Sequence, residues 1–252
     1  YLNSFFFIIF EISWKSFVLH SSLFNSLIAV STYFFLLEFR LSKTNSFLYS
    51  SSFALLMYPI VGTPFVDHHS TIFVILAFYS LILGIKNNSY FSWFIIPFLL
   101  CLGFLSKQTP TGYALVVISF IIIIFCVFNV KKFKIIFFPL LYGSIFSIIF
   151  LILFFYLTKI PLDSFWLQYF LYAKNVGEQR LLTMTISFKS IFFQYKFIYI
   201  PLVFLFLSLG VTLKSFKKNN EKFFIVISII SLSLLLIFHQ ILTSNQTYIF
   251  FL

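Results

Sequence analysis

The sequence has very little charge and little glycine or proline. Of its 252 residues only 9% are charged, and 7 are Gly and 7 are Pro, whereas 61% are apolar and 23% are aromatic. A soluble domain carries about a quarter charged residues, and a disordered chain combines much charge with few aromatics. Both classes are therefore excluded. With a mean hydropathy of +1.06, the composition predicts a polytopic membrane protein.

Cysteine is almost absent, and recognisable leader or nucleotide-binding motifs are missing. The two cysteines, Cys101 and Cys126, both lie in apolar runs. The topology derived below places them about 9 and 20 Å from the outer ends of neighbouring helices, so no disulfide is expected between them. No stretch with the pattern of a signal peptide is visible, and neither a Walker A pattern nor GxGxxG occurs.

The ends of the chain indicate a piece of a longer membrane protein. The first residue is Tyr1 rather than Met, and residues 248–252 open a fresh apolar run. We therefore expect an N-terminal outer loop and a C-terminal part to be missing. No internal repeat or linker divides the chain, so residues 1–252 are predicted to form a single transmembrane domain.

Long apolar runs recur along the whole chain. A spanning helix needs about 17–25 mainly apolar residues, and runs such as 120–125 lack the alternation of a β-barrel strand. Eight runs qualify, at about 16–37, 46–64, 69–86, 90–106, 113–130, 135–158, 192–213 and 223–242, and a ninth begins near Thr247. The predicted fold class is an all-α integral membrane bundle of about eight complete transmembrane helices plus a truncated ninth.

The basic residues give this bundle an orientation. Four short loops on one side carry ten basic residues: Arg40, Lys43, Lys86, Lys131, Lys132, Lys134, Lys214, Lys217, Lys218 and Lys222. The other side has fewer, spread over longer segments. Short loops rich in Lys and Arg stay in the cytoplasm, so the net charge of +11 is an orientation signal and an attraction to anionic membrane lipids. A nucleic-acid partner is not expected, because such a patch mixes its basic residues with polar, soluble surface.

One long stretch, residues 159–190, lies outside the predicted spans on the outer side. Its aromatic residues alternate with polar ones: Phe165, Trp166, Tyr169, Phe170 and Tyr172 with Asp163, Gln168 and Lys174. An amphipathic helix in the membrane interface has this pattern. An aromatic-rich loop at head-group depth fits equally well.

The first polar cluster at an outer helix end is Asp67-His68-His69. Asp67 fits a helix N-cap, but it also fits a general base or a group that positions a sugar hydroxyl. His68 and His69 can donate to phosphate oxygens or move protons near neutral pH. A metal site with His20 or His239 is a further option, although adjacent helical positions point about 100° apart and rarely share one ion.

The second cluster follows the fourth span, where Lys107 is the only charge in an outer turn. A lysine that ends a helix can extend its ammonium to water without any partner. However, Gln108, two threonines and a Pro and Gly surround this lysine at residues 108–112. A lysine at a low-dielectric boundary is a good point charge for phosphate.

A third, uncharged cluster closes the last complete span. It contains His239 and Gln240, followed by Asn245 and Gln246, and suits binding rather than catalysis; a simple polar turn explains it as well. Residues 178–180 in the long outer loop are interpreted as a solvated segment. All the candidate chemistry therefore faces outward, where a lipid-linked donor would supply what a cytosolic nucleotide sugar cannot.

The sequences GTPFVDHH at 62–69 and GFLSKQTP at 103–110 resemble the GT-C superfamily of membrane glycosyltransferases. The likeness is to the family 39-like and aminoarabinose-transferase-like branches, and its register covers about residues 10–130. Proteins of that kind place an acidic residue in one outer loop and, in the next, a lysine that meets the phosphate of a polyprenyl-linked sugar. Asp67 and Lys107 occupy these two successive outer loops.

The resemblance implies transfer of a sugar from a polyprenyl-phosphate carrier to a lipid or glycan acceptor on the outer side, with inversion and with no cofactor. Lys107, with His68 or His69 and Gln108, would hold the donor phosphate, and Asp67 would be the catalytic carboxylate. The family carries its main acid in the first outer loop, whose tail here is residues 1–15 with Glu11.

Two other functions fit the same residues. A transporter or flippase for a lipid-linked or anionic solute would use the lysine and histidines to recognise phosphate. Transporters, however, place charges near the bilayer midplane, where only Lys196 lies inside a predicted span. A structural subunit would tolerate Ala at Asp67 and Lys107. The bias toward Phe, Ile, Lys and Asn suggests an A/T-rich bacterial genome, and hence an inner-membrane protein with a periplasmic site.

Overall fold

The structure is a computed structural model that describes residues 2–57, 66–183, 188, 191–192, 195–217 and 220–243. Helices and short connections make up this part of the chain, and it contains no strand. The helices are α1 (Leu2–Phe10), α2 (Trp14–Glu38), α3 (Lys43–Met57), α4 (Val66–Asn87), α5 (Tyr90–Ser106), α6 (Gln108–Phe128), the 3-10 turn η1 (Val130–Lys132), α7 (Phe133–Thr158), α8 (Leu162–Phe165), the π-helix η2 (Trp166–Leu171), α9 (Tyr172–Thr183), α10 (Lys196–Lys214) and α11 (Asn220–Thr243).

A helix lies at each of the eight predicted spans, and most helix ends fall within a few residues of the prediction. Among the described residues, six helices are long and apolar enough to cross a membrane: α2, α4, α6, α7 (with η1), α10 and α11. The apolar α5 has only 17 residues and α3 has 15. The all-helical membrane class is confirmed, whereas the count of eight spans stays a prediction. The ninth run lies outside the described residues.

Charged residues stand at the ends of these helices. Lys196, which the sequence placed inside a span, is the first residue of α10, so that placement is wrong. The cause is the helix boundary, because α10 begins four residues later than the predicted run. At the lysine-rich end of the bundle, Lys86 lies 3.7 Å from Glu38 and Lys132 pairs with Glu221. Each pair joins two helices that are distant in sequence.

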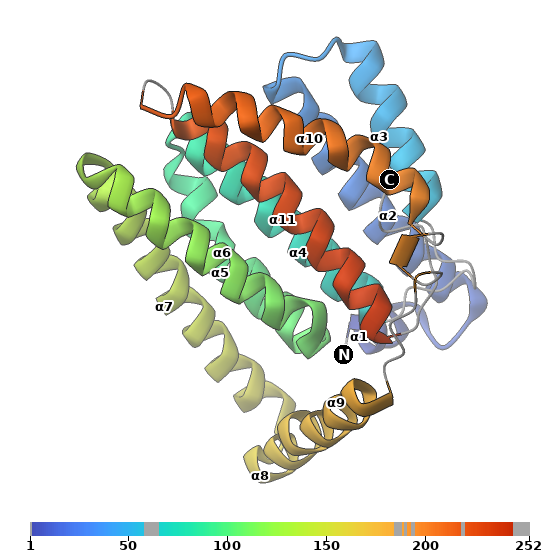
Figure 1. Cartoon of the computed structure of the whole chain (residues 1–252). Coiled ribbons are helices and arrows are strands. Elements are labelled where there is room, and N and C mark those ends of the chain that lie inside the picture. Colours follow the sequence, from blue (N-terminus) through green and yellow to red (C-terminus); the bar gives the residue numbers. More distant parts are fainter. Residues whose placement is uncertain are drawn as a thin grey trace.

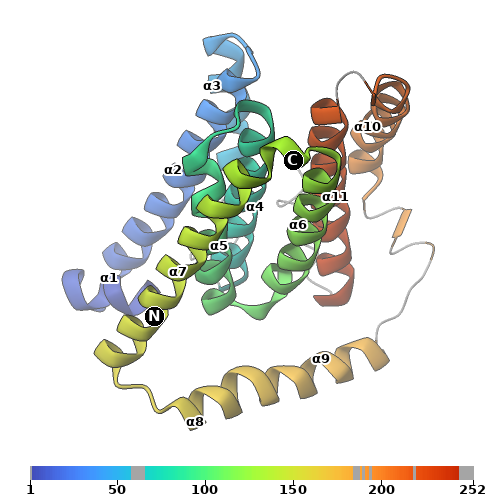
Figure 2. The same cartoon turned by 90° about the vertical axis from the view of Figure 1, so that its left-hand side faces the viewer.

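Helix α4 is the centre of the bundle. Its most apolar stretch is 78% buried, against 11–44% for the other five long apolar helices. It packs against α2, α5, α6 and α11, and Figures 1 and 2 show it enclosed by them. A helix that is apolar all round belongs in such a position. Phe78 of α4 and Trp93 of α5 are fully buried in this core, and Phe125 of α6 meets Phe224 of α11 edge to face at 5.1 Å.

The stretch between α7 and α10 begins with a helical segment formed by α8, η2 and α9. This segment runs across one end of the bundle, roughly perpendicular to the long helices (Figure 2). That end is also where α4 begins, and we call it the polar end. The sequence left open a helix or a loop here, and the structure has a helix over Leu162–Thr183. Its location in a membrane interface stays a prediction.

Gly143 tests the packing of α7 on α5. A Cβ at Gly143 would clash with the backbone carbonyl oxygen of Phe94, which cannot move as a side chain can. We expect Gly143→Ala to lower the free energy of unfolding by about 1–3 kcal/mol. Gly210→Ala is the matched control, because nothing lies within 4 Å of its Cβ position. Denaturant titration in a mild detergent measures both; equal stability of the two variants would contradict this packing.

Candidate functional site

The first turn of α4 carries five consecutive polar residues in a helix that its neighbours enclose. His68, His69, Ser70 and Thr71 are each 5% exposed or less, and the Asp67 side chain is 18% exposed. Burying polar groups without partners is costly. This turn therefore requires hydrogen-bonding groups from the helices around it.

The carboxylate of Asp67 takes its partners from two other parts of the bundle. The ammonium of Lys107, at the junction of α5 and α6, donates to Oδ1 of Asp67, and the Lys107 side chain is 19% exposed. Nε2 of His239, near the end of α11, lies 3.5 Å from the same oxygen. Asp67 is the second residue of α4, so it lies inside the helix rather than ahead of it as an N-cap would.

His69 faces the opposite way, toward α2. Its Nε2 lies 2.9 Å from Nε2 of His20, and both imidazoles are almost completely buried. Phe24 packs edge to face on both rings, at 5.0 Å from His20 and 4.5 Å from His69, and Phe6 of α1 adds a further contact to His20. One imidazole must donate and the other accept at this distance. The pair thus fixes the register of α2 against α4.

Ser70 adds a further contact between this turn and its neighbours. Ser70 Oγ and Thr111 Oγ1 of α6 are 2.6 Å apart, and Ser70 also donates to the carbonyl oxygen of Lys107 at 3.2 Å. The helices approach closely here because residue 103 is a glycine. A Cβ at Gly103 would lie 2.8 Å from Thr111 Oγ1 and 3.3 Å from Phe73.

The junction that presents Lys107 is a break between two helices. Lys107 is extended (φ −159°, ψ 139°) and both ends α5 and precedes α6. Thr109 is also non-helical, and the Thr109-Pro110 peptide is cis. Proline is tolerated in a first helical turn, because its missing N–H would have no partner there. Gln108 donates from Nε2 to the carbonyl oxygen of Tyr169 in η2 at 2.5 Å, which ties the junction to the segment across the polar end.

The structure brings most of the predicted site residues to the polar end. Asp67 and Lys107 meet directly, His68 and His69 lie in the same turn, and Gln108 is adjacent but hydrogen-bonds to η2. Asn245 and Gln246 lie outside the described residues.

The sequence considered His20 only as a metal ligand and His239 as a metal ligand or as part of a separate polar cluster, and it did not assign Ser70 and Thr111 to the site. All four histidines of the chain gather around the first turn of α4. The sequence contained one indication of this gathering, because all four histidines lie near predicted outer helix ends.

The cluster combines one carboxylate and one ammonium with four imidazoles. Such a set can bind an anion, accept a proton from a hydroxyl and pass protons. Over the described residues, no group of three or more His, Cys, Asp or Glu is arranged to hold a metal ion.

Known proteins place no further constraint on this chain. No family model matches it, and neither a curated protein nor a solved structure does. The fold and the site therefore define a helical membrane protein with a buried polar cluster at one end of its bundle.

A double-mutant cycle tests the pairing of Asp67 with Lys107. Removing one partner leaves a half-buried charge alone, so Asp67→Asn and Lys107→Met should each destabilise the protein, and the double variant should lose less than the sum. We expect a coupling of about 1–3 kcal/mol in the free energy of unfolding.

The pair Glu38 and Lys86 is the control for this cycle. It lies at the other end of the bundle with side chains 50% and 29% exposed, and exposed pairs couple by less than about 1 kcal/mol. Equal coupling in the two cycles would contradict the burial of the Asp67 pair.

Proposed function

We propose that this protein is a GT-C type glycosyltransferase that moves a sugar from a polyprenyl-phosphate-linked donor to a lipid or glycan acceptor on the outer side of the membrane. The observation that carries the proposal is the ion pair of Asp67 and Lys107, half-buried at the polar end with His239 beside it. The two charges come from the two motifs, at 62–69 and 103–110, that resemble this superfamily.

The donor phosphate competes with Asp67 for Lys107. With no donor bound, the ammonium is neutralised by the carboxylate. A phosphate carries more negative charge and more acceptor oxygens than a carboxylate, and a lysine ammonium is a compact partner for it. Donor binding therefore draws Lys107 away from Asp67, which leaves the carboxylate free to accept a proton and still near His239.

In the proposed transfer step these groups have separate roles. An acceptor hydroxyl oxygen forms a bond to C1 of the sugar as the bond from C1 to the phosphate oxygen breaks, and the electron pair of that bond leaves with polyprenyl phosphate. The hydroxyl proton passes to Asp67. Lys107 stabilises the negative charge that develops on the departing phosphate.

The positions of charge favour an enzyme with a one-sided site over a transporter. Transport pathways place ionisable groups near the bilayer midplane. Every charged residue of the six long apolar helices lies within four residues of a helix end, Asp67 and Lys86 of α4 being examples. The lysine-rich loops at the end opposite to Asp67 support a cytoplasmic location for that end and a periplasmic site, in a bacterial inner membrane.

Binding of polyprenyl phosphate by the purified protein tests the phosphate site. Lys107→Ala should weaken binding at least tenfold, about 1.4 kcal/mol, because the ammonium is lost. Lys86→Ala is the matched control, since Lys86 also pairs with a carboxylate but lies at the other end of α4. Equal affinity of the two variants would contradict the proposal.

Asp67→Asn separates binding from catalysis. This variant keeps Lys107 and removes the competing carboxylate, so its affinity for polyprenyl phosphate should be unchanged or higher, while sugar transfer is lost. The assay measures transfer of labelled sugar from the carrier to a membrane extract. Transfer at the wild-type rate would show that Asp67 is not the proton acceptor.

A further inference from the structure

A second site lies on the other side of α5, away from Asp67. Helix α5 packs against α4 on one side and against α7 on another, and a groove of about 630 Å³ runs between α5, α6 and α7. Its lining on α7 extends from Leu140 to Phe155, about 22 Å at the rise of a helix. The volume is within the range of ligand sites.

The walls of the groove suit a hydrocarbon. Of its 18 lining residues the only hydroxyl-bearing ones are Ser119, Ser144 and Ser147, and no charged residue is among them. Ser144 donates to Leu140 O at 2.8 Å and Ser147 to Gly143 O at 2.7 Å, within their own helix. The donor protons of Ser144 and Ser147 are thus already used within α7. A polar ligand would therefore find few hydrogen-bond donors in this groove.

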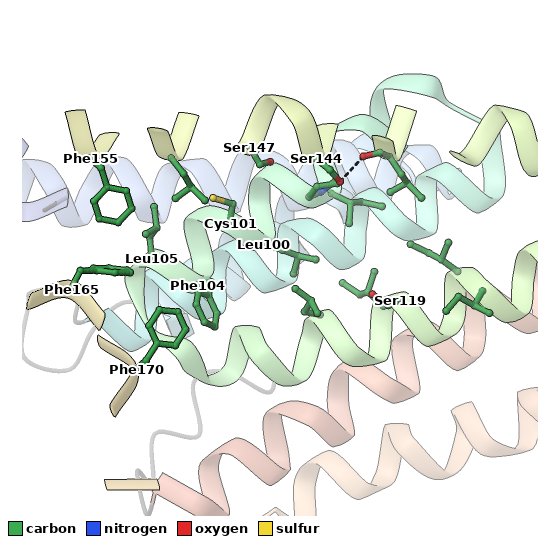
Figure 3. A pocket seen from close by; sticks show the side chains of 18 residues that line it. Leu100, Cys101, Phe104, Leu105, Ser119, Ser144, Ser147, Phe155, Phe165 and Phe170 are labelled. Atoms are coloured by element: carbon green, nitrogen blue, oxygen red, sulfur yellow. Dashed lines mark hydrogen bonds between the residues drawn. The ribbon is translucent and has the colours of Figure 1, made fainter. Parts of the chain in front are cut away.

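One end of the groove is closed by aromatic rings. Figure 3 shows Phe104, Phe155, Phe165 and Phe170 gathered there, with Ser119 and Ser144 further along. Phe155 and Phe165 meet edge to face at 4.9 Å. These rings join α5 and α7 to α8 and η2, so the closed end lies at the polar end of the bundle.

Two polar side chains lie near these rings, one of them buried and one exposed. The ring of Tyr169 stacks on Phe165 at 4.8 Å, and its buried hydroxyl has no hydrogen-bond partner among the described residues. Lys159 lies at the corner between α7 and α8, exposed, and no described carboxylate pairs with it.

The long side of the groove is open to the surroundings of the bundle. Leu115 and Ile123 line it and are also 47% and 62% exposed. The neighbouring residues Phe120 on α6 and Ile152 on α7 are likewise exposed apolar groups. In a bilayer these faces contact lipid, so the groove is continuous with the surface that lipid chains cover.

We infer that this groove binds one acyl chain of a membrane phospholipid, with the phosphate held at Lys159. The groove is long enough for such a chain, since a chain of one leaflet occupies about 15 Å, half of the hydrocarbon core, and the lining on α7 extends further than that. Phospholipid is also the ligand present in greatest excess at the open side, which favours its occupancy by mass action. This site is independent of the proposed sugar transfer.

Adjacent residues of α7 provide a matched pair of variants. Leu151 lines the groove, whereas Ile152 does not line it and is 62% exposed on the surface of α7. Native mass spectrometry of the protein after a detergent wash should find one retained phospholipid in the wild type and in Ile152→Trp. In Leu151→Trp the retained fraction should fall about fivefold or more, because an indole and an acyl chain cannot share the space. Equal retention in the two variants would overturn the inference, and so would retention of polyprenyl phosphate in place of phospholipid.

Photo-crosslinking of the unmodified protein removes any dependence on the folding of a variant. A phosphatidylcholine with a diazirine near the end of one acyl chain, in nanodiscs, should label peptides around Ser119 and Ser144 more strongly than the exposed face of α10 at Phe204. Uniform labelling of all lipid-facing helices would contradict a bound chain.

Lys159→Ala should reduce retention of phospholipid in the mass-spectrometry experiment. Lys174→Ala is the control and should not reduce retention, because Lys174 pairs with Glu178 at 3.8 Å.

Discussion

The enclosure of α4 by its neighbours is the constraint on which the rest of the structure depends. Because the helix is buried, the polar side chains of its first turn cannot all reach water and must find partners in the bundle. Three residues of other helices or junctions form hydrogen bonds with this turn. His20 of α2 pairs with His69, Lys107 at the junction of α5 and α6 pairs with Asp67, and Thr111 of α6 pairs with Ser70. His239 of α11 lies beside Asp67 as a further partner. The polar turn thereby orders the packing at this end of the bundle.

This arrangement concentrates the chemistry at one end of the molecule. A buried ion pair contributes little net stability, because desolvation offsets the attraction of its charges. Stability alone thus gives a weak reason for Asp67 and Lys107 to lie there. In the proposed function, Lys107 exchanges its partner, from the carboxylate of Asp67 to the donor phosphate, and this exchange requires both residues. The groove between α5, α6 and α7 differs from this end, because apolar side chains that suit lipid hydrocarbon make up most of its lining.

Much of the fold could be predicted from sequence, because spanning length and apolar composition act locally. The runs at 69–86 and 90–106 correspond closely to α4 and α5. Asp67 and Lys107 were recognisable as isolated charges in apolar surroundings. The pairing of His20 with His69 was not predictable, since it depends on how α2 packs against α4, and sequence periodicity does not specify packing partners. For the same reason the groove, made by three helices, had no sequence signal.

The most direct test of the central claim is an experimental structure of the protein in lipid nanodiscs with polyprenyl phosphate added. The account predicts phosphate density within hydrogen-bonding distance of Lys107 Nζ, with the contact between Lys107 and Asp67 broken and Asp67 still beside His239. Phosphate bound elsewhere, with the ion pair of Asp67 and Lys107 intact, would contradict it.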